Sequence, residues 1–152
     1  MKLTTFTDYS LRVLMYLAAA PERRATISQI CVAFGVKKNH LTKVVHHLGK
    51  HGWVATTRGK GGGLMLAKAA TDIRIAQVVQ DTEGKAMPAE CFAGEASSCT
   101  IRNCCHMKDI FGEAVSAFYQ VLDRYSLADI TRNREEIVSI LHFRPTTRRS
   151  VV

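Results

Sequence analysis

The fold is decided by residues 26–50, which read TISQICVAFGVKKNHLTKVVHHLGK. Thr26 and Ser28 can cap a short helix over residues 27–34. One face of that helix carries Ile27, Ile30, Cys31 and Phe34, with Cys31 expected to be a small buried apolar residue. Gly35 breaks it, and a second helix opens at residues 37–39, with the apolar stripe Leu41, Val44, Val45 and Leu48. Helix, glycine turn and helix together are typical of a helix-turn-helix motif.

The second helix of this motif has a basic and polar outer face. The positions outside the stripe are Lys38, Asn39, His40, Thr42, Lys43, His46, His47 and Lys50. A helical hairpin can be purely structural, but no acid here repels DNA phosphates, so we expect a recognition helix for the major groove. Its predicted DNA contacts are Lys38, Asn39, His40 and Lys43, and we expect His46, His47 and His51 to face solvent without binding metal.

The segments on either side of the motif complete a winged fold. Before it, Thr7 or Asp8 can cap a helix that ends at Pro21, with apolar positions Leu11, Leu14, Leu17 and Ala18. After it, two short strand patterns at 53–56 and 64–66 flank a glycine-rich basic tip. Arg58 and Lys60 at that tip are predicted to hold a wing against DNA. A nucleotide-binding loop is disfavoured, because the glycine-rich segment does not end in Gly-Lys-Ser/Thr and is not followed at once by a helix.

Charge supports a nucleic-acid partner. Residues 1–70 carry a net charge of +9, whereas residues 71–152 carry −1. A basic half of this kind favours DNA over an anionic membrane surface, with a merely solvated face as the plain alternative. No apolar run approaches the length of a membrane span and no secretory leader is visible, so we expect a cytoplasmic protein with no membrane partner.

Four of the five cysteines fall between Cys91 and Cys105. They follow a helix that Thr71 can cap and that ends near Gly84. Thiols are kept reduced in the cytosol, so such a cluster indicates metal binding or redox sensing rather than a structural disulfide. The spacing matches neither a zinc ribbon nor a ferredoxin, and leaves an iron-sulfur cluster, zinc or a thiol switch open.

A last apolar-periodic segment follows the cysteines. Its seam is Ile110, Phe111, Ala114, Val115, Phe118, Val121, Leu122 and Tyr125. We expect a long helix that crosses a second copy of itself in a homodimer, then a short helix capped at Ser126. The predicted organisation is a DNA-binding domain at 1–83, a cysteine-bearing loop at 84–105, dimerisation and C-terminal helices at 106–143 and a disordered tail at 144–152. The expected fold class is mainly α, a winged helix-turn-helix with a two-stranded wing.

The chain resembles a known family, the winged-helix iron-sulfur transcription regulators of bacteria, and within it the nitric-oxide-sensing repressors. The resemblance lies in residues 3–12, 36–41, 58–63 and 73–79 and in the third cysteine group, and covers roughly residues 1–141. It implies a homodimeric repressor of promoter DNA that holds an iron-sulfur cluster. Nitric oxide is the implied signal, and nitrosylation or loss of the cluster is implied to release the DNA.

The resemblance also implies the ligands. Cys91, Cys99 and Cys105 match the three family cysteines, with Cys104 as a rival for the third, and Asp8 from the partner's first helix matches the fourth ligand. A 4Fe-4S cluster is favoured and 2Fe-2S is the alternative, because Lys108 stands where the family's cluster-biogenesis regulator has a histidine ligand. The seven residues between Cys91 and Cys99 exceed the usual family spacing.

Other functions remain open from the sequence. A regulator of cluster biogenesis, or a zinc or thiol switch, could use the same scaffold. A metal or iron-sulfur carrier that does not bind nucleic acid could instead dock an acidic protein through its basic half. An enzyme is not expected, because no nucleophile, base and orienting group come together outside the cysteine segment.

Overall fold

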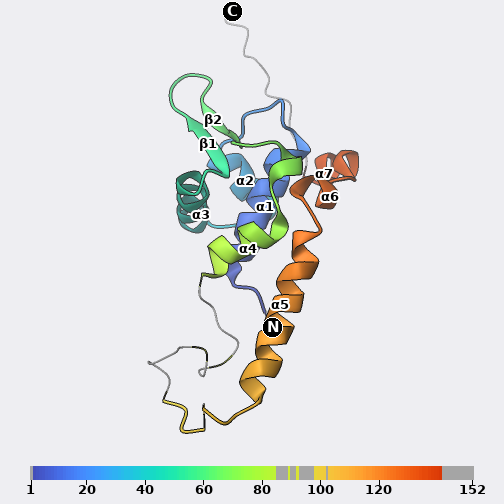
Figure 1. The fold of residues 1–152 in the computed structure, drawn as a ribbon. Coiled ribbons are helices and arrows are strands. Elements are labelled where there is room, and N and C mark those ends of the chain that lie inside the picture. The colour runs from blue at the N-terminus through green and yellow to red at the C-terminus, as the bar shows by residue number, and fades with distance from the viewer. Residues whose placement is uncertain (1, 85–88, 90–91, 93–97, 102, 142–152) are drawn as a thin grey trace, which may run out of the picture.

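The computed structural model describes residues 2–84, 89, 92, 98–101 and 103–141 (Figure 1). Cys91 and the tail predicted at 144–152 lie outside these residues. The elements are α1 (Thr5–Ala19), α2 (Ile27–Phe34), α3 (Lys38–Lys50), β1 (Val54–Thr57), β2 (Gly63–Leu66), the 3-10 turn η1 (Ala70–Asp72), α4 (Ile75–Glu83), α5 (Met107–Asp123), α6 (Leu127–Ile130) and α7 (Arg134–Ile140).

α1 begins earlier than the sequence predicted. Its N-cap is Thr4, whose hydroxyl oxygen accepts a 3.2 Å hydrogen bond from the Thr7 backbone N–H, so the expected cap at Thr7 or Asp8 is wrong. Thr4 is itself held by Glu83 at the end of α4, which accepts from the Thr4 backbone N–H at 2.7 Å and from its hydroxyl at 3.0 Å. This long-range partner fixes the cap, and Thr7 is buried in the first turn.

The helix-turn-helix is confirmed. Thr26 and Gln29 form a capping box at the start of α2, each side chain accepting the other residue's backbone N–H. Gly35 ends α2 in the left-handed conformation, with φ of 64°, where a side chain would be strained. The buried residues of α3 are the four predicted ones, Leu41, Val44, Val45 and Leu48.

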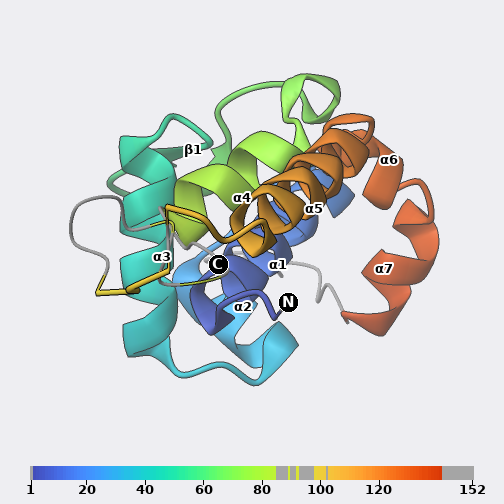
Figure 2. The ribbon, with the colours of Figure 1, turned by 60° about the horizontal axis from the view of Figure 1, so that its bottom comes forward.

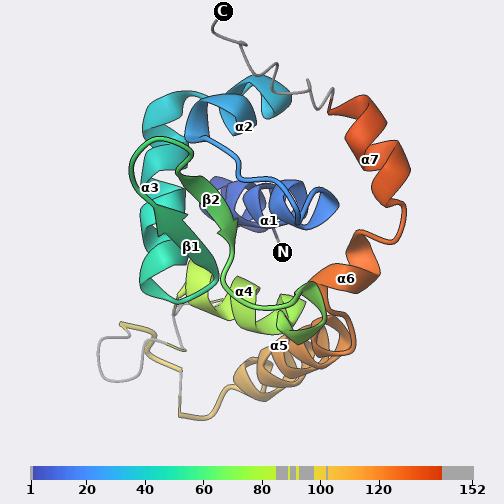
Figure 3. The same cartoon turned by 90° about the horizontal axis from the view of Figure 1, so that it is seen from above.

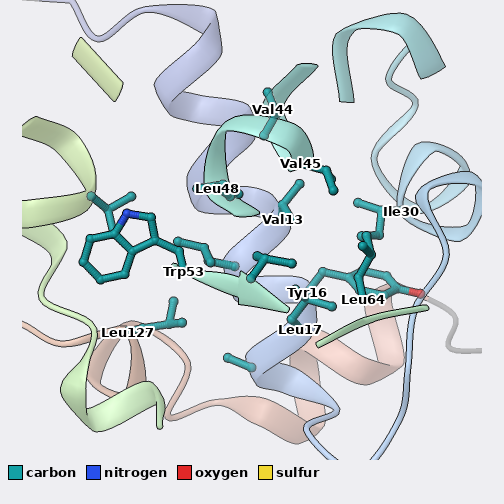
Figure 4. Close-up of a cluster of buried hydrophobic side chains, with 14 of the residues drawn as sticks. Val13, Tyr16, Leu17, Ile30, Val44, Val45, Leu48, Trp53, Leu64 and Leu127 are labelled. Atoms are coloured by element: carbon teal, nitrogen blue, oxygen red, sulfur yellow. The ribbon is translucent and has the colours of Figure 1, made fainter. Parts of the chain in front are cut away.

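The core surrounds α1. Figure 3 shows α1 at the centre, with α2, α3 and α4 around it and the wing crossing one side. The largest fully buried side chains include Leu14, Ile30, Leu41, Leu48 and Ile73, and Figure 4 shows part of this cluster. Each such side chain contributes about 1.5–3 kcal/mol relative to an exposed one, so packing around α1 fixes the position of α3.

The wing is a two-stranded antiparallel sheet, as predicted. Its register runs from Val54 opposite Leu66 to Thr57 opposite Gly63. Backbone hydrogen bonds between Ala25 and Leu64, of 3.0 and 2.7 Å, also tie β2 to the segment before α2. The base of the wing is therefore anchored to the helix-turn-helix, and its tip at residues 58–62 projects from it (Figure 1).

α4 begins later than predicted. Thr71 lies in η1, and α4 starts at Ile75 with Arg74 as its N-cap, so the expected cap at Thr71 is wrong. The reason is a backbone pairing with the segment after α5. Ile75 N–H donates to the Tyr125 carbonyl at 3.0 Å, and Leu127 N–H donates to the Ile73 carbonyl at 2.8 Å. This extended pairing holds residues 73 and 74 out of the helix, and Gly84 caps its end, as predicted.

α5 packs against α4 along part of its length (Figures 1 and 2). The predicted seam divides into two stripes. Phe118 and Leu122 turn inward against the chain's own core. Ile110 and Val121 face outward and are 58% and 48% exposed.

The chain after α5 returns to the body of the fold. Ser126 caps α6 in a capping box with Asp129, as expected from the sequence. Hydrogen bonds from the Ser126 backbone and hydroxyl, and from Arg132, lower the pKa of Asp129 to about 2. α7 lies beside the C-terminal end of α1, where Arg134 donates to the Ala19 carbonyl at 2.6 Å. None of the helices in the described ranges is long and apolar enough to cross a membrane.

Candidate nucleic-acid interface and cysteine segment

The outward face of α3 is basic and exposed. Lys38, Asn39, His40 and Lys43, the predicted DNA contacts on this helix, are all exposed. No side chain caps the N-terminus of α3. Thr42 donates to the Lys38 carbonyl at 2.9 Å, so its hydroxyl is engaged within the helix. The face therefore offers cations, an amide and a helix N-terminus to an anionic ligand.

The wing tip carries two further cationic side chains. Arg58 and Lys60, both exposed, lie between β1 and β2. β1 packs against α3, and Figure 3 shows the wing beside that helix. Gly59 and Gly61 have φ of 95° and 84°, so the tip uses conformations that residues with side chains rarely adopt.

Of the three histidines predicted to face solvent, His47 does not. Its ring packs edge-on against Phe6 of α1, with centroids 5.2 Å apart, and lies 4.0 Å from the His51 ring. Its Nε2 is buried and has no hydrogen-bond partner among the residues that the structure describes. Burial lowers the pKa of His47, nearby His51 and Lys50 lower it further, and Asp81 opposes the shift. The prediction for His47 is wrong because helical spacing alone did not reveal that α1 covers this side of α3.

α1 connects the predicted cluster ligand Asp8 to the recognition helix. Asp8 forms an ion pair with Arg12 at 2.9 Å. The Arg12 guanidinium also lies about 6 Å from the ring centres of Tyr9 and Phe34, and the Tyr9 ring lies 6.3 Å from that of His40. The sequence reasoning missed Arg12 and Tyr9, although the four-residue spacing of Asp8 and Arg12 is the spacing of a helical ion pair.

Glu83 is a second residue that the sequence reasoning missed. Burial opposes its ionisation, but hydrogen bonds from Thr7 and Thr4 outweigh burial and lower the pKa of Glu83. Its carboxylate therefore holds the start of α1 against the last turn of α4, one residue before Gly84.

Three of the four clustered cysteines can be placed. Cys99 and Cys105 are half-buried, and Cys104 is exposed, with its thiol donating to the Ile101 carbonyl at 3.4 Å. They lie just before α5, which starts at Met107. Cys31 lies on α2, half-buried against the core, in keeping with the expected apolar role.

The donor chemistry of this segment fits a thiophilic metal centre. Thiolate sulfur is the usual ligand of iron-sulfur clusters and a common ligand of zinc. Within the described residues, no group of three or more His, Cys, Asp and Glu side chains is arranged to hold a metal ion. Cys91 lies outside those residues, and Asp8 is engaged by Arg12 within its own chain.

The helix-turn-helix, the wing and the basic face of α3 together define a winged helix-turn-helix transcription regulator. The chain belongs to the Rrf2 family, which is described as iron-dependent transcriptional regulators. The family model matches residues 3–133 of this chain. It is 44% identical over 142 residues to the HTH-type transcriptional regulator NsrR of Bacillus subtilis strain 168, covering 93% of this chain and 97% of that protein. It is 40% identical over 147 residues to NsrR of Shouchella clausii, covering 96% and 99%.

Solved structures confirm the fold class. IscR of T. potens has a TM-score of 0.72 at 23% identity, covering 90% of each chain. CymR, the global cysteine regulator of B. subtilis, has a TM-score of 0.72 at 21% identity, covering 88% of this chain and 98% of that one. The relatives are transcription regulators and not enzymes, which confirms the expectation that this chain is not an enzyme. The family also favours a regulator over an iron-sulfur carrier.

Proposed function

We propose that the chain is a homodimeric repressor that binds promoter DNA and releases it when nitric oxide reaches an iron-sulfur centre held by its cysteine segment. The observation that carries the DNA-binding part is the exposed cationic face of α3 beside a basic wing. The relatives named NsrR support a regulator of this kind.

In this proposal, α3 enters the major groove. Lys38, Asn39, His40 and Lys43 contact base edges or phosphates there. Arg58 and Lys60 hold the wing to the sugar-phosphate backbone. Neutralising phosphates releases condensed counterions, so affinity for the promoter should fall steeply as salt rises.

The outer stripe of α5 is the proposed dimer contact. Ile110 and Val121 are large apolar side chains about half exposed on one helix. Covering such side chains with the same stripe of a second copy removes apolar surface from water, at about 25 cal/mol per Å². A two-fold dimer then presents two α3 helices to successive turns of DNA.

We also propose a division of roles along the chain. Residues 1–83 bind DNA, residues 84–105 sense nitric oxide, and residues 106–143 form the dimer and C-terminal helices.

The cysteine segment is the proposed sensing site. Cys91, Cys99 and Cys105 would hold the centre, with Cys104 as the rival third thiolate and Asp8 supplied by the second copy. When bound, an iron-sulfur cluster supplies iron for nitric oxide to bind, and the four-iron form is favoured. Cys105 lies two residues before α5, so a restraint on its thiol acts directly on the start of the proposed dimer helix.

One experiment tests the sensing part first. The chain is purified without oxygen, its iron and sulfide are measured, and its absorption is recorded before and after nitric oxide. We expect a broad visible band that nitric oxide bleaches or shifts. A colourless protein holding zinc, or no metal, would overturn the iron-sulfur part and point to a zinc or thiol switch.

Promoter binding is tested on the same preparation. We expect labelled promoter fragments to shift in gels at low salt, less at high salt and less after nitric oxide. Absence of a shift at every salt concentration would overturn the DNA-binding part.

A further inference from the structure

Trp53 occupies the junction between the recognition helix and the wing. Its backbone N–H donates to the Leu48 carbonyl near the end of α3 at 2.9 Å. Its own carbonyl accepts a 3.0 Å hydrogen bond from the N–H of Ala67, just after β2. Trp53 is therefore joined through its backbone to the helix and to the far strand of the wing, and its side chain is 4% exposed.

The Trp53 side chain connects this junction to α4. The indole Nε1–H donates to Asp81 Oδ2 at 2.9 Å, and Figure 4 shows the indole reaching from the core toward α4. The ammonium of Lys68 lies 4.7 Å from the ring centre on one face. A hydrogen bond to a charged carboxylate is stronger than a typical neutral one. The Asp81 carboxylate therefore fixes the position of the indole relative to α4.

Asp81 is placed to respond to the cysteine segment. It lies on the last turn of α4, two residues before Glu83, which holds the start of α1. The chain passes from that turn through Gly84 toward the cysteines. A shift of the last turn of α4 would therefore pull on Trp53, and Trp53 would pass the shift to both DNA-facing elements.

We propose that the hydrogen bond between Trp53 and Asp81 couples the state of the cysteine segment to the placement of α3 and the wing. Both residues are positioning residues, since neither contacts DNA in this arrangement. This inference rests on the proposed function and names the route by which the sensing segment acts on the DNA-binding face.

The first test compares promoter affinity in two states. The dissociation constant for a promoter fragment is measured for the iron-loaded and the iron-stripped chain, and the ratio of the two constants is the coupling. W53F keeps an aromatic ring and removes the donor; D81A removes the acceptor; D81N keeps an uncharged acceptor. We expect W53F and D81A to reduce the ratio at least threefold and D81N to restore part of it. A purely structural role would change both constants by the same factor, and an unchanged ratio in W53F and D81A would overturn the proposal.

K68Q is the matched control. It removes the cation above the same ring and leaves the hydrogen bond to Asp81 in place. Any lost contact of Lys68 with DNA affects both states equally and cancels in the ratio. We expect the K68Q ratio to match that of the parent chain, and a K68Q ratio reduced as far as that of D81A would overturn the role of the hydrogen bond.

The second test does not depend on iron. Trp53 is the only tryptophan in the chain, so tryptophan emission reports on this site alone. In the iron-stripped chain we expect promoter binding to change the emission. We expect D81A to reduce that change more than D81N does. An emission unaffected by bound promoter in the parent chain would overturn the inference. A chain that binds promoter but never holds iron would instead overturn the sensing part of the proposed function.

Discussion

The carboxylate of Asp8 lies 2.9 Å from the guanidinium of Arg12, one turn further along α1. The two side chains are 46% and 43% exposed. A partly exposed pair at this spacing is worth only about 0.3–0.5 kcal/mol. Asp8 can therefore exchange Arg12 for another cation at small cost, as the proposed ligand role requires.

Asp8→Ala should separate stability from metal binding. We expect the free energy of unfolding of the metal-free chain to fall by less than about 1 kcal/mol, because only an exposed pair and a weak helix-dipole term are lost. In the iron-loaded chain we expect a changed visible spectrum or faster bleaching in air. Asp72→Ala, an exposed acid on η1, is the control. An Asp8→Ala spectrum and lifetime equal to those of the parent chain would contradict the ligand assignment.

Lys43→Ala and Lys60→Ala should each weaken promoter binding. Each replacement removes one proposed phosphate contact, so the slope of log affinity against log salt should become shallower by about 1 unit. Affinity is measured between low and moderate salt by fluorescence anisotropy of a labelled fragment. Lys108→Ala, at the start of α5, removes the same charge away from the interface and should leave the slope unchanged. Slopes unaffected by Lys43→Ala and Lys60→Ala would show that these lysines do not contact phosphate.

His47 should make folding sensitive to acid. Its folded-state pKa is lowered, chiefly by burial, so the folded chain binds a proton at His47 less readily than the unfolded chain does. The stability contribution is therefore complete above the unfolded pKa of about 6.5 and is lost as the pH falls toward the lower folded-state value. His51, Lys50 and Asp81 are the charged or titratable groups that act on it.

The measurement is urea unfolding from pH 7.5 to pH 5. We expect His47→Gln to flatten this part of the stability curve relative to the parent chain. His46→Gln, at an exposed position on the same helix, should leave the pH dependence as it is. If both variants follow the parent curve, His47 is not the group responsible.

Local sequence signals predicted the DNA-binding half well. The capping residue Thr26, the left-handed turn at Gly35 and the stripe on α3 each depend on a few neighbouring residues, and the structure contains all three. The errors arise where a distant segment intervenes. Glu83 moves the cap of α1 to Thr4, and pairing with the segment after α5 delays α4.

The candidate site shows the same limit. The exposure of Lys43 and Arg58 follows from periodicity and turn composition. The packing of His47 against Phe6 and the hydrogen bond from Trp53 to Asp81 depend on how α1 and α4 pack against α3 and the wing. A single sequence does not contain that packing in any local pattern.

Ile110→Asp should disrupt the proposed dimer. Ile110 is 58% exposed in the single chain, so the substitution should hardly affect folding of the protomer. In a dimer it would bury two unpaired carboxylates in place of two apolar side chains. Losing one buried isoleucine contact costs about 1.5–3 kcal/mol, so the dimer dissociation constant should rise at least tenfold.

Sedimentation velocity across a dilution series measures this change. Ser116→Asp adds the same charge on an exposed position of α5 away from the outer stripe, and it should leave the dimer intact. Promoter affinity should fall with Ile110→Asp and recover at high protein concentration, because two α3 helices are needed to bind two half-sites. A parent chain that sediments as a monomer at all concentrations, or an Ile110→Asp chain that remains a dimer, would show that the outer stripe of α5 has another use.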